Sequence, residues 1–130
     1  MIVVDASAFV PYVAQAGHDA SWVAGRLRRE AAFYAPELID AEVLSGLTRL
    51  VLLGVISASK ASNAVLKLLD ARIVRYSHRP FVPRAWELRG QFTPYDGLYV
   101  ALAEALDATL VTTDRRLARA VTTVDVAVPS

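Results

Sequence analysis

The 130-residue sequence predicts an α/β sandwich with a mostly parallel central sheet. Short β-branched or apolar runs alternate along the chain with longer segments of helical periodicity, and such alternation is typical of strands joined by crossover helices. In addition, 55% of the residues are hydrophobic, which is enough for a core without disulfides. We therefore expect one domain that covers residues 1–130.

The first half of the chain predicts two strands and four helices. Asp19 is the expected N-cap of the second helix, and Ser57 that of the fourth. Pro36 and Glu37 suit the first turn of the third helix, which Gly54 would end. In chain order, the expected elements are a strand at 2–4, helices at 7–15 and 20–30, a strand at 32–34, and helices from 36 to about 53 and from 57 to about 70.

The second half continues the alternation. Pro83 suits the first turn of a helix, and the segment "TPYD" at 93–96 is turn-like, so that Asp96 would begin the next helix. The expected elements are a strand at 73–76, helices at about 81–91 and 96–107, a strand at 109–112, a helix at 114–121 and a last strand near 124–128.

Composition excludes several classes of protein. The chain has no cysteine, so we expect neither a disulfide framework nor a thiolate metal site, and a reducing cytoplasm is the expected location. The longest apolar stretch in its middle, Leu50–Ile56, is too short to span a membrane. The N-terminal segment lacks a basic region and is interrupted by Asp5, which argues against a signal peptide. The high mean hydropathy of +0.36 predicts a homodimer or a bound partner.

The basic residues are twelve arginines and two lysines, and the formal net charge is only +1. Five arginines lie between positions 72 and 89 with a single acid, Glu87, among them. Three more form a group at 115–119. Arginine suits phosphate contact, but charge alone favours the interpretation that these groups belong to a solvated surface.

Four acids are expected at one edge of the sheet. Asp5 follows the first predicted strand directly, Asp114 follows the segment "TLVTT" (109–113), and parallel strands end at the same edge. Crossover helices begin at that edge, which places Asp96 there, and Glu42 lies one to two turns into its helix. Each acid also has a simpler interpretation, because Asp5, Asp96 and Asp114 are good N-caps and Glu42 could face solvent.

Helix capping does not explain why several acids gather at one edge. Like charges there repel, and some would hold a proton unless a cation is bound. Oxygen ligands suit Mg²⁺ or Mn²⁺. Only two histidines are present, His18 and His78, and we expect both in turns or at the surface rather than in a zinc site.

Four segments in this order resemble PIN-domain ribonucleases, and especially the VapC-type toxins of prokaryotic toxin–antitoxin pairs. The segments are "IVVDASAFV" (2–10), "PELIDAEVLSGL" (36–47), "FTPYDGLYVALAEAL" (92–106) and "TLVTTDRRLARAV" (109–121). The resemblance implies a PIN-like three-layer α/β/α sandwich and a metal-dependent endonuclease that cleaves single-stranded RNA.

The resemblance also implies a set of site residues. Its acidic positions match Asp5, Glu42, Asp96 and Asp114, and the "LxxxEV" pattern selects Glu42 over Asp40. Two polar positions of the family match Ser7 and Thr112, whereas Thr113 matches none. Gly97 stands where alanine is more usual. No acid of the motif is missing, so an inactive domain is not indicated.

The mechanism that follows is hydrolysis of an RNA phosphodiester assisted by Mg²⁺ or Mn²⁺. Asp5 and Asp96 are the expected main ligands, with Glu42 and Asp114 as ligands or as bases that orient water. Ser7 and Thr112 would hydrogen-bond the acids or the attacking water. Given the resemblance, phosphate contact becomes the expected role of Arg115 and Arg116.

The implied partners are RNA, with tRNA or rRNA loops as targets, a cognate antitoxin that occludes the site, and a second copy of the chain. Two other enzyme classes fit less well. A haloacid-dehalogenase phosphatase needs an acid where Ser7 stands, and a receiver domain needs a lysine on a late strand. A PIN nuclease that processes RNA without toxicity, and a non-catalytic RNA- or protein-binding module, remain open.

Overall fold

The computed structural model describes all 130 residues and contains five strands and seven α-helices. The strands form one sheet in the order β3-β2-β1-β4-β5, and every neighbouring pair is parallel. The prediction of a mostly parallel sheet is therefore confirmed. The strands are β1 Ile2–Val4, β2 Phe33–Pro36, β3 Ile73–Tyr76, β4 Thr109–Val111 and β5 Val126–Ala127.

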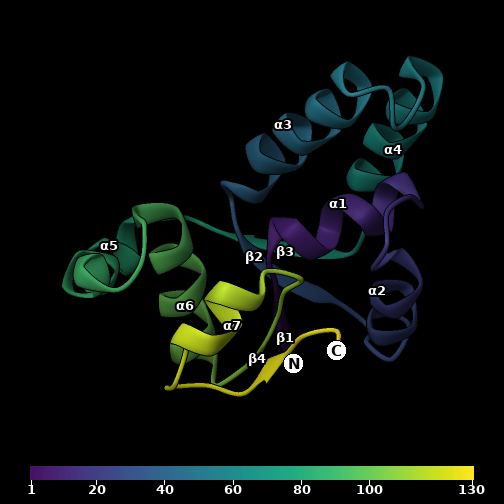
Figure 1. Cartoon of the computed structure of the whole chain (residues 1–130). Helices are drawn as coiled ribbons and strands as arrows, with labels where there is room; N and C mark the ends of the chain where they lie inside the picture. The colour runs from purple at the N-terminus through teal and green to yellow at the C-terminus, as the bar shows by residue number, and fades with distance from the viewer.

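Helices lie on both sides of the sheet and give the molecule three layers (Figure 1). Helix α1 packs against α2, α3 and α4, whereas α6 packs against α5 and against strands β1, β2 and β4. Helices α3 and α4 project together beyond the sheet. The α-helices are α1 Ala6–Ala14, α2 Ala20–Leu27, α3 Ile39–Leu52, α4 Ala58–Asp70, α5 Val82–Glu87, α6 Pro94–Leu106 and α7 Arg115–Ala120.

The prediction that Pro36 opens a helix is wrong. Pro36 ends strand β2, where it is in register with Tyr76 of β3, and α3 begins only at Ile39. Proline is tolerated there because the neighbouring residue continues the ladder: the N–H of Glu37 donates to the Tyr76 carbonyl oxygen at 2.9 Å. Proline therefore fits the end of the strand without leaving a gap in its hydrogen bonds.

Helix α3 begins under a cap that is remote in sequence. The N–H of Leu38 donates to Nε2 of His78 at 2.9 Å, and His78 is partly buried. The imidazole thus satisfies one of the free N–H groups at the start of the helix.

Two further helix boundaries differ from the prediction. Helix α2 ends at Leu27 because the next residues form tighter turns, with Glu30 N–H donating to the Leu27 carbonyl. The Asp19 side chain makes no capping bond, since its backbone is not in the extended conformation of an N-cap. The segment 81–91 is helical but irregular, because 3₁₀ turns at Arg79–Phe81 and Leu88–Gly90 flank the short α5.

The core is centred on strand β1, all three residues of which are completely buried. Beside it, the rings of Phe9, Tyr12 and Phe33 pack in tilted and edge-on pairs, with ring centroids 5.2–6.0 Å apart. No helix of the chain combines the length and the apolar character that spanning a membrane requires. The packed β1 gives a rigid support to the residues that follow it.

We predict that Gly46→Ala destabilises the protein. A Cβ at position 46 would lie 2.6 Å from Cγ2 of Val10, a stiff β-branched side chain on α1. Overpacking of this kind typically costs about 1–3 kcal/mol. Gly25→Ala is the matched control, because it is also helical and a Cβ there meets nothing within 4 Å. Denaturant unfolding should show a lower free energy of unfolding for Gly46→Ala and an increase of up to about 1 kcal/mol for Gly25→Ala. Equal increases in the two variants would contradict the close packing of α1 on α3.

Several arginines of the 72–89 group are held by other side chains. Arg75 binds Asp40 through two hydrogen bonds of 2.7 and 2.8 Å, and Arg84 binds Glu104 through two of 2.8 and 3.1 Å. The guanidinium of Arg89 stacks 4.3 Å from the ring of Trp86. These three arginines therefore serve the fold, and the group offers fewer free charges than the sequence implies.

The Glu104 carboxylate is expected to make stability pH-dependent. Its pKa is lowered by hydrogen bonds from Arg84 and from the Thr123 hydroxyl, against an opposing effect of burial. A lowered pKa stabilises the fold above the ordinary pKa of an unfolded glutamate, about 4.3, and the contribution is lost as pH falls through the lower folded value. On acidification, the Glu104→Gln protein should therefore lose less thermal stability than the parent protein. Equal decreases of the melting temperature at acidic pH in the two proteins would contradict this.

Candidate active site

The ends of two neighbouring strands form the base of the candidate site. Strands β1 and β4 are paired with Val4 opposite Val111, so the residues that follow them, Asp5 and Thr112, lie side by side. The N–H of Asp5 donates to the Val111 carbonyl at 2.9 Å and continues the ladder. The parallel sheet thus places an acid and a hydroxyl at the same edge.

Asp5 is buried and receives two hydroxyl groups. Ser7 Oγ and Thr112 Oγ1 both donate to its Oδ2, at 2.7 and 2.8 Å. Asp5 is only 6% exposed and Thr112 is fully buried, so the carboxylate has little freedom to turn. Ser7 and Thr112, the two polar residues that the resemblance selected, are thereby brought together with the first acid.

The same hydroxyls tie the segment after β4 to the start of α1. Ser7 Oγ accepts a hydrogen bond from the N–H of Thr113 at 3.1 Å, and Thr112 Oγ1 accepts one from the N–H of Asp114 at 3.0 Å. The hydroxyl of Thr113 donates to the Ser7 carbonyl at 2.8 Å. Thr113, which matches no family position, therefore joins the two segments that carry Asp5 and Asp114.

Glu42 enters from α3 and is met by Tyr99 of α6. The Tyr99 hydroxyl donates to Glu42 Oε1 at 2.8 Å, and Tyr99 is fully buried. Sequence reasoning missed this contact, because tyrosine at helical spacing is more typical of packing. The two residues are 57 positions apart, and no local pattern predicts such a pair.

The other two acids come from α6 and α7. Asp96 lies in the first turn of α6, but it is not the N-cap: Thr93 is, and its Oγ1 accepts the N–H of Asp96 at 3.1 Å. Asp114 does cap α7, accepting the N–H groups of Arg116 and Leu117 at 3.0 and 3.1 Å. Asp96, Asp114 and Arg116 line one cavity of about 240 Å³.

The four acids, here called the acidic cluster, influence one another electrostatically. Burial is the main cause that raises the pKa of Asp5, and the charge of Asp114 adds to it. Burial also raises the pKa of Glu42 and of Asp96, and the charge of Asp5 raises both further. Carboxylates that resist ionisation in this way favour a bound cation.

The acidic cluster fits a hard divalent cation by chemistry and charge. Its donor atoms are carboxylate oxygens, which Mg²⁺ and Mn²⁺ prefer, and the mutual repulsion of the acids is what a cation would relieve. As the side chains lie, no three of the Asp, Glu or His residues are arranged closely enough to form a complete metal site.

The two arginines that follow Asp114 differ in their surroundings. Arg115 donates to the Thr113 carbonyl, to Asp19 and to the carbonyl of Ser130, so it is engaged with its own chain. Arg116 is exposed, lines the cavity, and its charge acts to lower the pKa of Asp96. Of the two, Arg116 is the better placed to meet a phosphate.

Comparison with known proteins identifies the family. The PIN domain model matches residues 2–122. The chain belongs to the PIN-domain family. Among related PIN proteins, Ribonuclease VapC1 of Mycobacterium tuberculosis is 45% identical over 119 residues, which cover 91% of this chain and 89% of the relative. Ribonuclease VapC3 of the same species is 40% identical, with coverage of 92% and 86%.

Two solved structures share this PIN fold. The crystal structure of PAE2754 from Pyrobaculum aerophilum has a TM-score of 0.69 at 23% identity and covers 96% of this chain and 87% of its own. VapBC2 from Rickettsia felis, bound to a DNA fragment from their promoter, has a TM-score of 0.68 at 17% identity and covers 100% of both chains. The resemblance to VapC-type PIN proteins and the expected sandwich are thus confirmed.

Proposed function

We propose that this PIN protein is a VapC-type toxin, an endoribonuclease that hydrolyses RNA phosphodiester bonds with Mg²⁺ or Mn²⁺. The observation that carries the proposal is the acidic cluster: one acid follows strand β1, three come from helices α3, α6 and α7, and their charges act on one another. Its relatives, named as VapC ribonucleases at 37–45% identity over nine-tenths of the chain, support the choice of RNA as substrate.

We assign the four acids of the cluster different roles in the reaction. Asp5, fixed through Ser7 and Thr112, and Asp96, at the cavity wall, would be the main ligands of the ion. When bound there, a divalent cation would supply a lowered pKa for a water and an offset to the charge of the phosphate. Glu42 and Asp114 would orient that water or accept its proton. No side-chain nucleophile is needed.

Substrate would approach along the cavity beside Asp96 and Asp114. Bare carboxylates repel a phosphate, so the cation is needed for binding as well as for chemistry. Arg116 on the rim adds a positive charge that can pair with a neighbouring phosphate of the strand. Arg115 would contribute less, because Asp19 and the carbonyl of Ser130 already engage it.

Incubation of the purified chain with single-stranded RNA and Mg²⁺ tests the activity. The wild type should produce internal cuts, and Asp96→Asn should produce none while keeping its circular dichroism spectrum. Asp70→Asn, at an exposed position at the end of α4, is the matched control and should cleave normally. Absence of cleavage by the wild type would favour a non-catalytic binding module instead.

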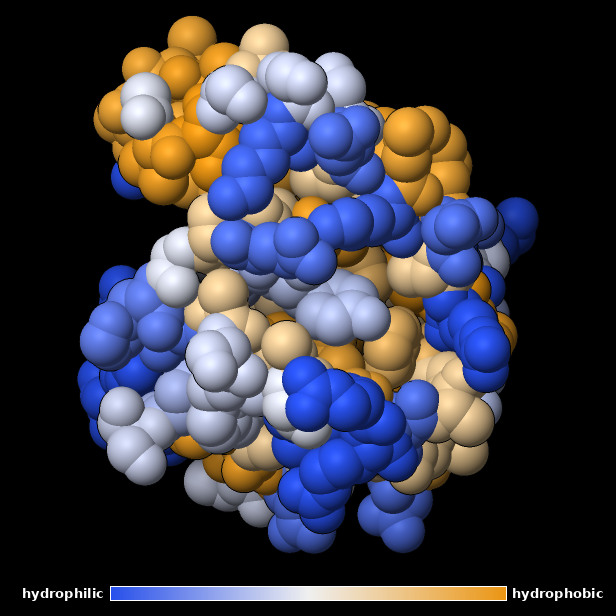
Figure 2. Space-filling view, turned by 90° about the vertical axis from the view of Figure 1, so that its right-hand side faces the viewer, coloured by the Kyte–Doolittle hydropathy of each residue, from blue (hydrophilic) through white to orange (hydrophobic).

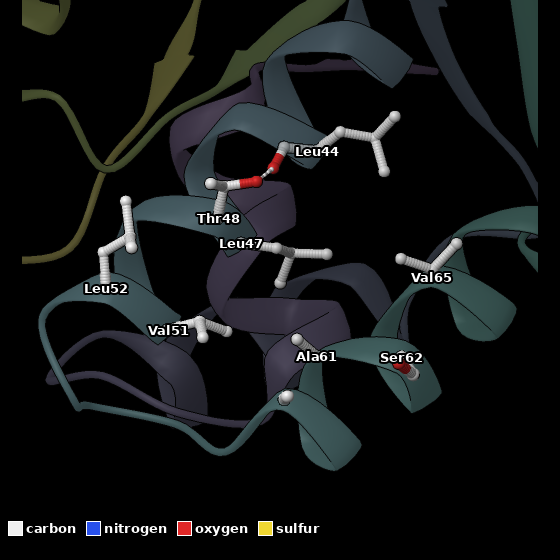
Figure 3. Close-up of a pocket in the computed structure, with 9 residues that line it drawn as sticks. Leu44, Leu47, Thr48, Val51, Leu52, Ala61, Ser62 and Val65 are labelled. Carbon is white, nitrogen blue, oxygen red and sulfur yellow. Dashed lines mark hydrogen bonds between the residues drawn. The ribbon is translucent and has the colours of Figure 1, made fainter.

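The toxin part of the proposal involves an inhibitory partner, for which the α3–α4 pair offers a surface. An apolar groove with a volume of about 460 Å³ runs between the two helices (Figure 3). Leu52 on its wall is 81% exposed and Leu44 is 46% exposed. Figure 2 shows hydrophobic residues gathered at the top of the molecule, where α3 and α4 project. The groove is lined by Leu44, Leu47, Thr48, Val51, Leu52, Ala58, Ala61, Ser62 and Val65.

The charged residues of the segment that forms α3 and α4 favour an acidic partner for this groove. Between Glu42 and Asp70 the chain has no acidic residue, and its charged side chains there are Arg49, Lys60 and Lys67. A second copy of the chain would bring these like charges together, whereas an amphipathic helix with acidic flanks would complement them. We therefore assign the groove to the helix of an acidic antitoxin.

Co-expression with the product of the adjacent reading frame tests this assignment. The two proteins should co-purify, the complex should not cleave RNA, and Leu52→Glu should release the partner without loss of cleavage. A Leu52→Glu variant that still binds would exclude the groove. If the groove instead joins two copies, the isolated chain will be a dimer that Leu52→Glu dissociates. Sedimentation of the purified chain tests the predicted homodimer. Growth of cells after induction of the chain distinguishes a toxin from a nuclease that processes RNA without toxicity.

A further inference from the structure

The buried tyrosine of α6 has one polar atom, and that atom points at the acidic cluster. Tyr99 is 0% exposed and follows Asp96 by three residues, so both lie on the same side of α6. Its hydroxyl donates to Glu42 Oε1 at 2.8 Å. One hydroxyl thus joins α6, which carries Asp96, to Glu42 of α3.

Glu42 has no other partner that would hold its carboxylate. No second side chain forms a hydrogen bond or an ion pair with it, and it is only partly buried. A glutamate side chain loses considerable rotamer freedom when it is fixed. Without the tyrosine, its carboxylate could turn away from Asp5 and Asp96.

We propose that Tyr99 is a positioning residue that holds the Glu42 carboxylate towards the ion and the attacking water. The inference rests on the proposed function, and it deepens it by adding a residue that touches neither substrate nor ion. Through its bond to Oε1 the tyrosine restricts rotation of the Glu42 carboxylate and leaves Oε2 without a side-chain hydrogen bond. A partner of a ligand side chain typically affects metal affinity or activity by about 10–100-fold.

The tyrosine could instead serve the fold alone, as a buried hydroxyl that needs an acceptor. The two roles differ in what Tyr99→Phe changes. A structural role alters stability and leaves the ion and the reaction unaffected. A positioning role leaves the fold intact, weakens ion binding, and lowers kcat more than it raises KM.

Mn²⁺ titration by calorimetry and RNA cleavage kinetics of Tyr99→Phe test the inference. We expect Mn²⁺ affinity and kcat to fall about 10-fold or more, with KM nearly unchanged. Tyr34→Phe is the control, because Tyr34 is a partly buried tyrosine outside the acidic cluster. This variant should behave as the wild type. Wild-type affinity and kcat in Tyr99→Phe would overturn the inference.

A double-mutant comparison separates positioning from packing. In a Glu42→Ala background the carboxylate is gone, so Tyr99→Phe should cause no further loss of Mn²⁺ affinity. An equal loss in both backgrounds would show that the tyrosine acts through the fold.

A crystal structure of Tyr99→Phe gives a readout that does not depend on activity. The Glu42 side chain should leave its position or occupy several rotamers, and an unmoved, well-ordered Glu42 would refute the inference. If the wild type neither binds Mn²⁺ nor cleaves RNA, the proposed function fails, and this structure still decides whether Tyr99 holds Glu42.

Discussion

Replacement of Asp5 by asparagine should abolish RNA cleavage and at the same time make the ion-free protein more stable at neutral pH. Asparagine keeps an acceptor for Ser7 and Thr112, but it lacks the charge that holds a cation. We expect a loss in kcat of about 10³-fold or more, which corresponds to about 4 kcal/mol of transition-state stabilisation. Cleavage assays and thermal unfolding in EDTA measure the two effects.

The gain in stability follows from the sign of the pKa shift. Burial raises the pKa of Asp5 above the ordinary value of about 4. Below that ordinary value the acid is protonated in both states and does not oppose folding. As pH rises through the raised folded value, ionisation of the buried group lowers stability, and asparagine avoids that loss. The stabilisation should therefore grow from acid to neutral pH.

Asp125→Asn is the control for both effects, since Asp125 is exposed and does not belong to the acidic cluster. It should leave cleavage unchanged and shift the melting temperature little. An Asp5→Asn protein that cleaves RNA, or one that is less stable than the wild type at neutral pH in EDTA, would show that the acid is not a strained, functional group.

Removal of divalent cations should have an equally large effect. EDTA should stop cleavage completely, and Mg²⁺ or Mn²⁺ should restore it, because the acidic cluster repels phosphate unless a cation is bound. The ion should also raise the melting temperature of the wild type. An ion that binds only the folded state adds about 2.7 kcal/mol to the free energy of unfolding when its concentration is 100 times its Kd.

The melting curves supply an internal control. A protein with both Asp5→Asn and Asp96→Asn should gain no stability from Mg²⁺, whereas Asp125→Asn should gain as much as the wild type. Cleavage that persists in EDTA would mean that hydrolysis does not depend on the ion.

The sequence was sufficient for the layer architecture because the signals are local. The β-branched run at Ile2–Val4 and the caps at Ser57 and Asp114 are strong features, and the structure has the corresponding elements. The errors fall where a partner remote in sequence decides. Pro36 stays in β2 because β3 pairs with it, and no local pattern around Pro36 predicts that pairing.

The acids could be placed near one another because strand ends and helix starts share an edge in a parallel sheet. The residues that hold the acids in place could not be predicted in this way. The Tyr99–Glu42 hydrogen bond joins α6 to α3, and the Thr113 hydroxyl joins the end of β4 to α1, so both depend on packing. The ion pairs of Arg75 and Arg84 likewise appear only in the fold, which is why charge along the sequence overstated the surface available to RNA.

The acid-free stretch between Glu42 and Asp70 was visible in the sequence, but its meaning depended on the structure. Only the packing of α3 beside α4 turns scattered leucines into an apolar groove. The high mean hydropathy is thereby traced in part to a defined surface.

The most direct test of the central account is a crystal structure of the chain with Mn²⁺, with its position found by anomalous scattering. We expect a strong peak bounded by the carboxylates of Asp5 and Asp96, with Glu42 still hydrogen-bonded to Tyr99. No peak in this cluster at Mn²⁺ concentrations that support cleavage, or a peak at other residues, would contradict it.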